Sequence, residues 1–220
     1  MEPAPALPAA PLLADDAREL ERCLARGGVA VIPTDTVYGL CCDPDDARAV
    51  ARLYELKGRP ASRPAAVMFF ALEPALRALP ELCEGERTAV EALLPGAVTL
   101  LLANRGDRFT PACGPEPGTL GLRVPRLPDR LQVLSTVARP VMQSSANISG
   151  EPDPRRLGEV PARLLAAADL VLDGGELPGR PSTVIDLRDY ERTRQWELVR
   201  AGALSTTAVR DALREGPQEQ

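Results

Sequence analysis

VAVIPTDTVYGL (residues 29–40) carries the pattern on which the fold prediction rests. Its first four residues, VAVI at 29–32, form a compact apolar run that is closed by a proline, which predicts a buried strand leading into a loop. Thr34, Asp35 and Thr36 follow at the end of that strand, where loops on a rigid sheet often build functional sites. The alternative is that these side chains only satisfy nearby backbone groups.

Helical patterns lie on both sides of this segment. Residues 15–27 place apolar side chains at helical spacing, with Gly27 where a C-terminal cap belongs. After the Gly turn, a second helix is predicted with Asp43 as its N-cap and Pro44 at its first position, ending at Lys57.

The rest of the chain continues to mix the two kinds of element. Further strands are predicted at 65–70, 97–103, 119–124, 140–143, 169–173, 182–187 and 196–200. Further helices are predicted at 74–79, 84–94, 128–138, 162–168 and 205–214. Because the strands show no strict alternation, they indicate a sheet covered on at least one face, and one α/β domain is the simplest interpretation.

Composition excludes several classes of protein. The chain has 220 residues, 45% of them hydrophobic, and a net charge of −5, which argues against a protein that coats nucleic acid through a basic face. No apolar run reaches the roughly 18 residues that a membrane span needs, so no contact with a membrane is expected. The five Cys form no C-x-x-C pair, which fits a reduced, cytoplasmic setting. The opening MEPAPALPAAPLL is interpreted as a short extended tail.

The absence of His limits the available chemistry. With no His in the sequence, Ser-His-Asp and Cys-His machinery, His-ligated zinc and the usual neutral-pH general base are all excluded. Chemistry must therefore rest on cations, hydroxyls, carboxylates, backbone dipoles or a metal that the ligand brings.

KGRPASRP (57–64) gathers three cations within seven residues. Lys57, the one Lys in a chain with 25 Arg, stands there beside Arg59 and Arg63. Arginine forks and a lysine point charge suit a polyphosphate, whereas the alternative is a solvated run of charges. The segment is not a P-loop, because no G-x-x-x-x-G-K-[ST] occurs, and no G-x-G-x-x-G indicates a dinucleotide site.

Two more segments place small polar or basic residues at strand ends. QSSANISG (143–150) offers Ser145 and Asn147 to an anion or a nucleotide, although a hydrogen-bonded turn explains them equally well. GRPSTVIDL (179–187) brings Ser182 to the start of a strand. Arg123 and Arg200 each end a predicted strand.

Taken together and in order, these segments resemble one known family. The blocks are PTDTVYGL, KGRPxxRP, LPGAVTLLL (94–102), GTLGLRVP (118–125), SSANISG and STVID. They resemble the YrdC-like family of threonylcarbamoyl-AMP synthases, in its single-domain form. The resemblance covers residues 15–207, which would form the catalytic domain, after a Pro/Ala-rich tail at 1–14 and before a short helix end and polar tail at 208–220.

The resemblance implies a fold and a reaction. The expected fold is a twisted, mostly mixed β-sheet flanked by helices, with a concave basic cavity. The expected reaction condenses L-threonine, bicarbonate and ATP into threonylcarbamoyl-AMP and pyrophosphate, with Mg²⁺ arriving on the nucleotide and no metal ligand expected from the protein. The product would pass to a tRNA-modifying transferase complex, for the adenosine beside the anticodon. Only weak contact with tRNA itself is expected.

The resemblance also implies roles for individual residues. The positions that would hold threonine are Thr36, Arg123 and Ser182. The positions around ATP are Arg59, Arg63, Thr119, Ser145, Asn147 and Arg200. The expected catalytic cations are Lys57, Arg59 and Arg63. This chain departs from the family at Met68, where many members have a His near threonine, and a thioether cannot donate the hydrogen bond of an imidazole.

Two rival functions remain open from the sequence. One is a related enzyme that adenylates a carbamoyl group for a different acceptor, as in hydrogenase maturation. The other is a non-enzymatic protein that binds structured RNA with the same cavity, although 3% aromatic residues give it few stacking platforms.

Overall fold

The structure is a computed structural model that describes residues 10–58 and 65–214. Its strands are β1 Ala30–Ile32, β2 Gly39–Cys42, β3 Ala66–Met68, β4 Val98–Ala103, β5 Thr119–Arg123, β6 Val141–Ser145, β7 Leu170–Val171, β8 Thr183–Asp186 and β9 Glu197–Arg200. Its α-helices are α1 Ala14–Ala25, α2 Ala47–Lys57, α3 Leu72–Ala78, α4 Glu84–Leu93, α5 Thr110–Cys113, α6 Ala162–Ala167, α7 Tyr190–Thr193 and α8 Thr206–Arg214. Two 3-10 helices are η1 Asp129–Thr136 and η2 Leu157–Glu159.

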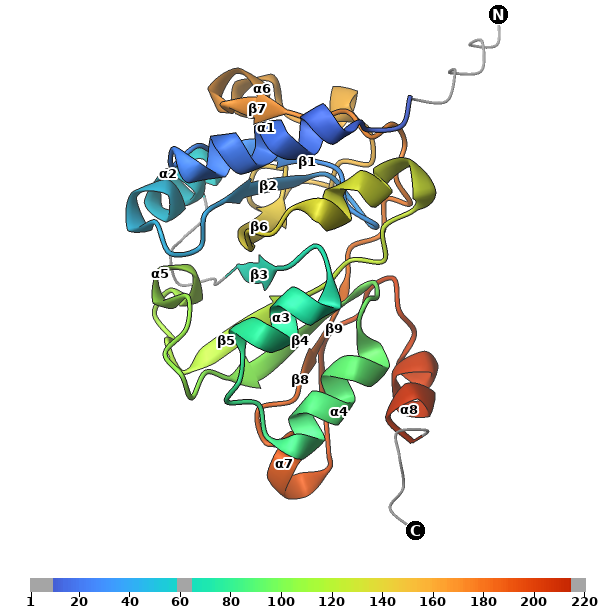
Figure 1. Ribbon diagram of the computed structural model, residues 1–220. Helices are drawn as coiled ribbons and strands as arrows, with labels where there is room; N and C mark the ends of the chain where they lie inside the picture. Colours follow the sequence, from blue (N-terminus) through green and yellow to red (C-terminus); the bar gives the residue numbers. More distant parts are fainter. Residues whose placement is uncertain (1–9, 59–64, 215–220) are drawn as a thin grey trace, which may run out of the picture.

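The described strands form one mixed sheet. Their order is β7-β1-β2-β6-β3-β5-β4-β8-β9, with parallel pairing in β1–β7, β3–β5 and β4–β8 and antiparallel pairing elsewhere. Helices α1, α2 and α6 gather around β1, β2 and β7, while α3, α4, α7 and α8 gather around β4, β8 and β9 (Figure 1). The predicted mixed α/β fold is therefore confirmed.

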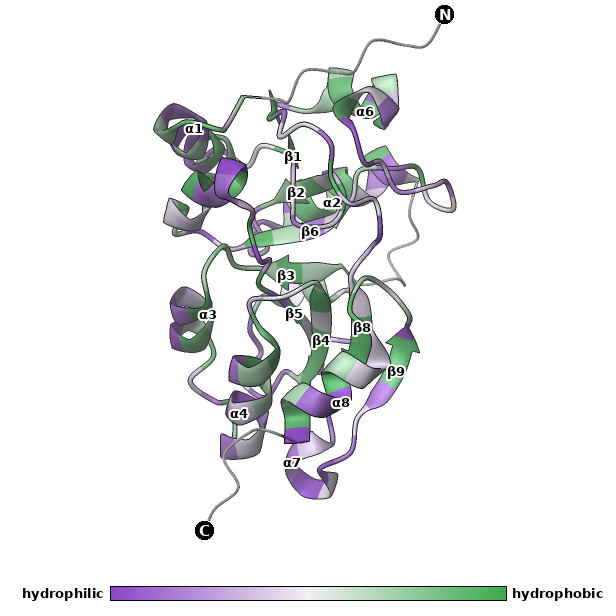
Figure 2. Cartoon of the chain, turned by 90° about the vertical axis from the view of Figure 1, so that its right-hand side faces the viewer, coloured by the Kyte–Doolittle hydropathy of each residue, from purple (hydrophilic) through white to green (hydrophobic). Residues whose placement is uncertain are grey.

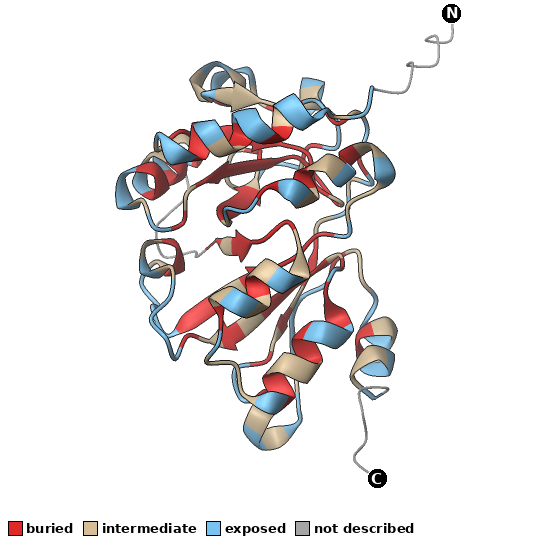
Figure 3. Cartoon of the chain, in the orientation of Figure 1, coloured by how far each residue is buried: buried red, intermediate tan, exposed pale blue. Residues whose placement is uncertain are grey.

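The core forms where the sequence has its apolar runs. Residues 29–32 are all fully buried, as expected of a strand covered on both faces. Helix α1 buries Leu20 and Leu24 against this strand region, and each fully buried leucine contributes about 1.5–3 kcal/mol. The strands are largely hydrophobic and buried, whereas the outer faces of the helices are hydrophilic and exposed (Figures 2 and 3).

Helix α2 begins later than the sequence predicted. Its N-cap is Asp46, whose carboxylate accepts the backbone N–H groups of residues 48 and 49, rather than Asp43. Asp43 instead accepts the N–H of Asp45 in a local turn, so the prediction of Asp43 and Pro44 at the helix start is wrong. The predicted end at Lys57 is correct, because Gly58 takes the left-handed conformation of a C-terminal cap, at φ 57°.

The predicted α-helix over 128–138 is a 3-10 helix, η1. Ser135 and Thr136 donate their hydroxyl hydrogens to carbonyl groups three residues earlier, at 132 and 133. Such side-chain bonds compete with a regular helix, and the β-branched residues of this segment favour one only weakly.

The other differences concern element ends and short elements. Strand β2 and helices α5 and α7 were not predicted, and β3 covers only three of the six residues expected at 65–70. Strand β2 pairs with both β1 and β6, which carries the 33–40 segment into the middle of the sheet. Among the described residues, no helix is long and apolar enough to cross a membrane.

Candidate active site

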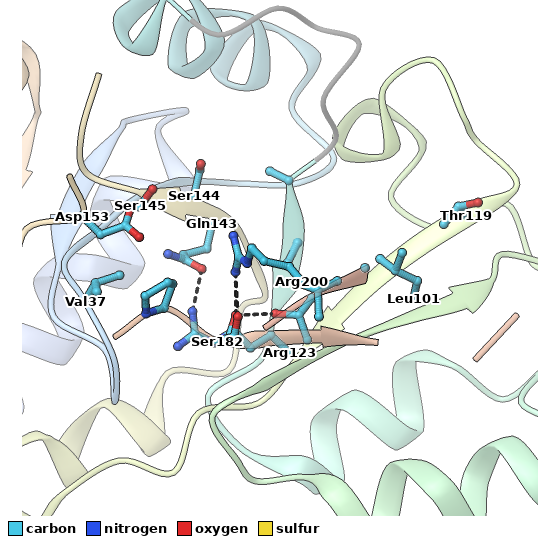
Figure 4. A pocket seen from close by; sticks show the side chains of 16 residues that line it. Val37, Leu101, Thr119, Arg123, Gln143, Ser144, Ser145, Asp153, Ser182 and Arg200 are labelled. Carbon is cyan, nitrogen blue, oxygen red and sulfur yellow. Dashed lines mark hydrogen bonds between the residues drawn. The ribbon is translucent and has the colours of Figure 1, made fainter. Parts of the chain in front are cut away.

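A cavity opens over the middle of the sheet, on a face built from alternate residues of several strands. Gly121 and Arg123 of β5 line it, as do Gln143 and Ser145 of β6. Because side chains two apart on a strand share a face, these pairs point to the same side of the sheet. Figure 4 shows the side chains of Arg123 and Gln143 close to Ser182, which precedes β8, and to Arg200 at the end of β9.

Arg123 lies at the centre of a buried polar cluster. Its Nη2 donates to Asp35 Oδ1 and to Thr36 Oγ1, both at 2.6 Å, and its Nη1 donates to Gln143 Oε1 at 3.1 Å. The side chains of Arg123 and Asp35 are only 4% and 6% exposed. The structure thus brings together Thr36 and Arg123, which lie 87 positions apart in the chain.

The charge of Arg123 is balanced inside the protein. The second oxygen of Asp35, Oδ2, accepts the backbone N–H of Arg126 at 3.0 Å, so both carboxylate oxygens have donors. A buried ion pair is tolerated when such additional bonds are made. The Nε of Arg123 is buried and has no acceptor among the described residues.

Thr34 has a local role. Its hydroxyl donates to the carbonyl of Val37 at 2.7 Å and accepts the backbone N–H groups of residues 36 and 37. The alternative interpretation from the sequence, that a residue here satisfies nearby backbone groups, is therefore correct for Thr34. The turn that it closes holds Thr36 toward Arg123.

A second polar group surrounds Ser182 on the other side of the cavity. The hydroxyl groups of Ser182 and Thr99 are 2.9 Å apart, and Arg200 Nη2 donates to the carbonyl oxygen of Ser182 at 2.8 Å and to its Oγ at 3.3 Å. Arg200 also lines the cavity, from the end of β9 (Figure 4). Ser182 and Arg200 were assigned to different ligands by the resemblance, but they are direct neighbours.

The pKa of Arg200 is lowered from its usual value. Desolvation by the surrounding protein is the largest cause, the negative charge of Asp153 opposes it, and the positive charge of Arg123 adds to it. A guanidinium nevertheless keeps its charge in proteins, so Arg200 presents a cation to the cavity.

Lys57 is buried, with 1% of its surface exposed. Its ammonium donates to the carbonyl oxygens of Ser145 and Asn147 and, at 3.0 Å, to the side-chain oxygen of Asn147. The alternative of a solvated charge is therefore wrong for Lys57. The three bonds tie the end of α2 to the turn that follows β6.

The turn at 145–147 is fixed mainly by Asn147. Its Oδ1 accepts the hydroxyl of Ser145 at 2.7 Å as well as the Lys57 ammonium, and its Nδ2 donates to the carbonyl of Glu151. Ser145 lines the cavity, whereas the side chain of Asn147 is committed to the turn. The hydrogen-bonded turn that the sequence left as an alternative is thus present, and Ser145 remains beside the ligand space.

Three further residues were predicted to bind ATP. Thr119 lines the cavity at the start of β5, where its hydroxyl accepts the Nη1 of Arg188 at 3.3 Å, well away from Arg123 in Figure 4. Arg59 and Arg63 fall outside the described residues, so their predicted contacts stay predictions.

Met68, which replaces a His of many family members, lies next to Arg123 in the sheet. It is fully buried on β3 and is in register with Arg123 of β5 on one side and Val141 of β6 on the other. The thioether therefore stands beside the Arg123 cluster.

Sequence reasoning did not assign Asp35, Thr99, Gln143 or Asp153 to the site. Asp35 was noticed as polar, and Thr99 and Gln143 are polar residues within apolar strands, which is a usable signal. Asp153 lies in a Pro-rich loop and gave none. Among the described residues, no group of three or more acidic or cysteine side chains could hold a metal ion.

Comparisons with known proteins identify relatives over most of the chain. The model of the Sua5/YciO/YrdC family, described as telomere recombination, matches residues 22–202. A threonylcarbamoyl-AMP synthase of Chromohalobacter salexigens is 36% identical over 187 residues, which are 83% of this chain and 98% of the relative. One from Pyrococcus abyssi is 32% identical over 196 residues, which are 87% of this chain and 55% of the relative. This chain thus spans about half the length of some curated relatives and nearly all of others.

Solved structures agree with the fold. The crystal structure of P. abyssi Sua5 complexed with L-threonine has a TM-score of 0.76 and 28% identity, over 91% of this chain and 58% of that one. E. coli YciO has a TM-score of 0.76 at 24% identity, over 91% of this chain and 95% of that one, and supports the fold alone.

Proposed function

The chain belongs to the Sua5/YciO/YrdC family, and we propose that it synthesises L-threonylcarbamoyl-AMP from L-threonine, bicarbonate and ATP. The observation that carries the proposal is Arg123, which lines the cavity and is held in place by Asp35 and Thr36, whose buried side chains do not themselves line it. It is supported by relatives named for this activity and by a related structure that binds L-threonine.

The proposed reaction has two steps. The α-ammonium group of threonine and bicarbonate first give an anionic carbamate, water and a released proton. A carbamate oxygen then attacks the α-phosphorus of ATP and pyrophosphate leaves. Neither step forms a bond to the protein, so the residues act by alignment and by neutralising charge.

The residues divide this work by their surroundings. Arg123 is held by Asp35 and Thr36 in one geometry, which suits a fixed contact with the amino acid. Ser182 is held between Thr99 and Arg200, at the other wall of the cavity. The further donors of Arg200 bind no described residue, so they are available to a carboxylate or a phosphate.

Mg²⁺ would enter with the nucleotide. The described lining supplies one carboxylate, Asp153, and several hydroxyls, which is too few oxygens for a cage made by the protein. Mg²⁺ commonly keeps several waters and binds through substrate phosphates, and this lining fits that mode. The ion would neutralise phosphate charge as pyrophosphate departs.

The test is a set of pyrophosphate-release assays in which one component is left out at a time. Release should require ATP, Mg²⁺, bicarbonate and L-threonine together, and serine and valine in place of threonine would measure selectivity beside Met68. Release at the full rate without an amino acid would overturn the proposal. RNA binding that depends on salt, with no turnover of ATP, would favour the RNA-binding alternative.

The product would be used by a separate transferase complex for tRNA modification. Purified chain with ATP, bicarbonate and labelled threonine should therefore leave tRNA unlabelled, and added transferase components should restore labelling. Labelling by this chain alone would contradict that division of labour.

A further inference from the structure

The cavity carries opposite charges on different walls. Arg200 enters from the end of β9, and Asp153 enters from the loop that follows β6 (Figure 4). The two groups interact electrostatically, but no salt bridge or hydrogen bond joins them. The space between them is therefore polarised and open to a ligand.

Asp153 differs from the other carboxylate of this region. Both oxygens of Asp35 have donors, from Arg123 and from the backbone of Arg126. The carboxylate of Asp153 is half-buried and accepts no hydrogen bond from any described residue. A partly desolvated carboxylate without donors is costly, and a cationic donor on a ligand would relieve that cost.

Of the proposed substrates, only the amino acid carries a positive charge that Asp153 could bind. Bicarbonate and ATP are anions, whereas the amino acid enters as a zwitterion with a cationic α-ammonium group. The cavity lining presents both signs of charge, with Asp153 from the loop after β6 and the arginines Arg123 and Arg200 from β5 and β9.

We propose that Asp153 binds the α-ammonium group of the amino-acid substrate, so that the substrate carboxylate faces Arg200 and Arg123. This inference rests on the proposed function and adds a binding residue and an orientation to it. The reaction then changes the sign of the interaction. The ammonium that Asp153 attracts becomes an anionic carbamate, which Asp153 repels toward the cations and the α-phosphate.

The test is the binding of L-threonine measured by calorimetry without nucleotide or Mg²⁺. Asp153→Asn keeps the shape of the side chain and removes its charge. Its dissociation constant for threonine should rise about 10- to 100-fold, the range expected for a lost charged hydrogen bond. Glu151→Gln is the matched control, because it removes a charge from an exposed side chain of the same loop and should bind as the wild type does.

A cycle with a second ligand isolates the ammonium contact. 3-Hydroxybutyrate lacks the amino group of threonine, so it should bind the wild type weakly and Asp153→Asn about equally weakly. The preference for threonine over 3-hydroxybutyrate should therefore collapse in Asp153→Asn. Asp153→Ser provides a second uncharged side chain, and the thermal midpoints of all variants verify folding.

The outcomes separate this inference from the proposed function. Equal threonine affinity in the wild type and Asp153→Asn would overturn the inference alone. A raised Mg²⁺ requirement in Asp153→Asn with unchanged threonine binding would also overturn it, in favour of a metal contact. Failure of the wild type to bind threonine or to release pyrophosphate would overturn both.

Discussion

Two arginines of one cavity are held in opposite ways. Arg123, on a central strand, is buried and bound to Asp35, Thr36 and Gln143. Arg200, on the edge strand β9, is exposed, and Ser182 is its hydrogen-bond partner within the described part of the chain, through Nη2. The first is positioned by the protein before any ligand arrives, whereas the second keeps donors for a ligand. Substitution of Arg123 should therefore lower the free energy of unfolding, whereas substitution of Arg200 should lower turnover with little change in stability.

The largest effect on the free energy of unfolding is expected for Arg123→Ala. The change leaves Asp35 buried without its cation, and breaking a buried pair in this way costs about 3–5 kcal/mol. Urea unfolding measures the loss, and pyrophosphate release should fall with it. Arg123→Ala combined with Asp35→Asn should recover part of the stability, because no unpaired charge remains. A loss below about 1 kcal/mol for Arg123→Ala would contradict the role of the pair.

The Arg123 cluster also shows what sequence can predict. Position at strand ends drew attention to Thr36 and Arg123, but only the resemblance to a known family assigned them to a ligand. The contact between them depends on strand register across the sheet, which no local pattern encodes. Gln143 joins Arg123 because β6 and β5 both flank β3, an arrangement set by long-range pairing.

Some elements of the fold could likewise be predicted from local sequence and others could not. The continuous apolar run at 29–32 predicted a buried strand, because consecutive apolar residues place apolar side chains on both faces of a strand. Strand β2 was missed because its residues GLCC lack the alternation and the β-branched side chains typical of strands, and its two neighbouring strands hold it in place. The start of α2 was misplaced because several acidic residues compete for the cap within four positions.

Lys57→Met is expected to have the second largest effect. The change removes an ammonium that donates hydrogen bonds to Ser145 and Asn147. Leaving a buried acceptor without a donor lowers the free energy of unfolding by about 1–3 kcal/mol. We expect unfolding free energy and pyrophosphate release to fall together, because the displaced turn carries Ser145 at the cavity. Lys57→Arg should not rescue either quantity, since a planar fork does not fit three acceptors placed for an ammonium. A collapsed rate with unchanged stability would instead show that the ammonium acts directly on the substrate.

The ion pair of Asp169 with Arg52 is exposed but has the same distance between charged atoms as the buried pair of Asp35 with Arg123. The carboxylate of Asp169 lies 2.6 Å from Arg52, like the Asp35–Arg123 pair, but the two side chains are 42% and 40% exposed. Asp169→Asn should therefore cost only about 1 kcal/mol, as surface pairs do. Asp35→Asn makes the same substitution in the buried pair, so comparing it with Asp169→Asn measures the effect of burial at equal distance between the charged atoms.

The pH dependence of this pair has a definite sign. The hydrogen bond from Arg52, with that from the backbone of Val29, lowers the pKa of Asp169 below its usual value of 3.8. A lowered folded-state pKa gives stability that is present above the usual pKa and is lost as the pH falls through the folded value. The difference in unfolding free energy between wild type and Asp169→Asn should be constant near neutrality and vanish in acid. A difference that grows in acid would contradict this assignment.

Arg200→Ala should change stability least while impairing turnover strongly. The side chain is exposed on an edge strand, so its removal should change the free energy of unfolding by less than about 0.5 kcal/mol. A cation set against developing phosphate charge is worth roughly 2–4 kcal/mol in the transition state, so pyrophosphate release should fall about 30- to 1,000-fold. Arg192→Ala is the control, because its side chain is 74% exposed on α7 and, among the residues that the structure describes, pairs with Asp189 alone. If Arg200→Ala released pyrophosphate as fast as Arg192→Ala, the donors that Arg200 leaves for a ligand would have no role in the reaction. Arg123 and Arg200 would then differ only in how deeply they are buried.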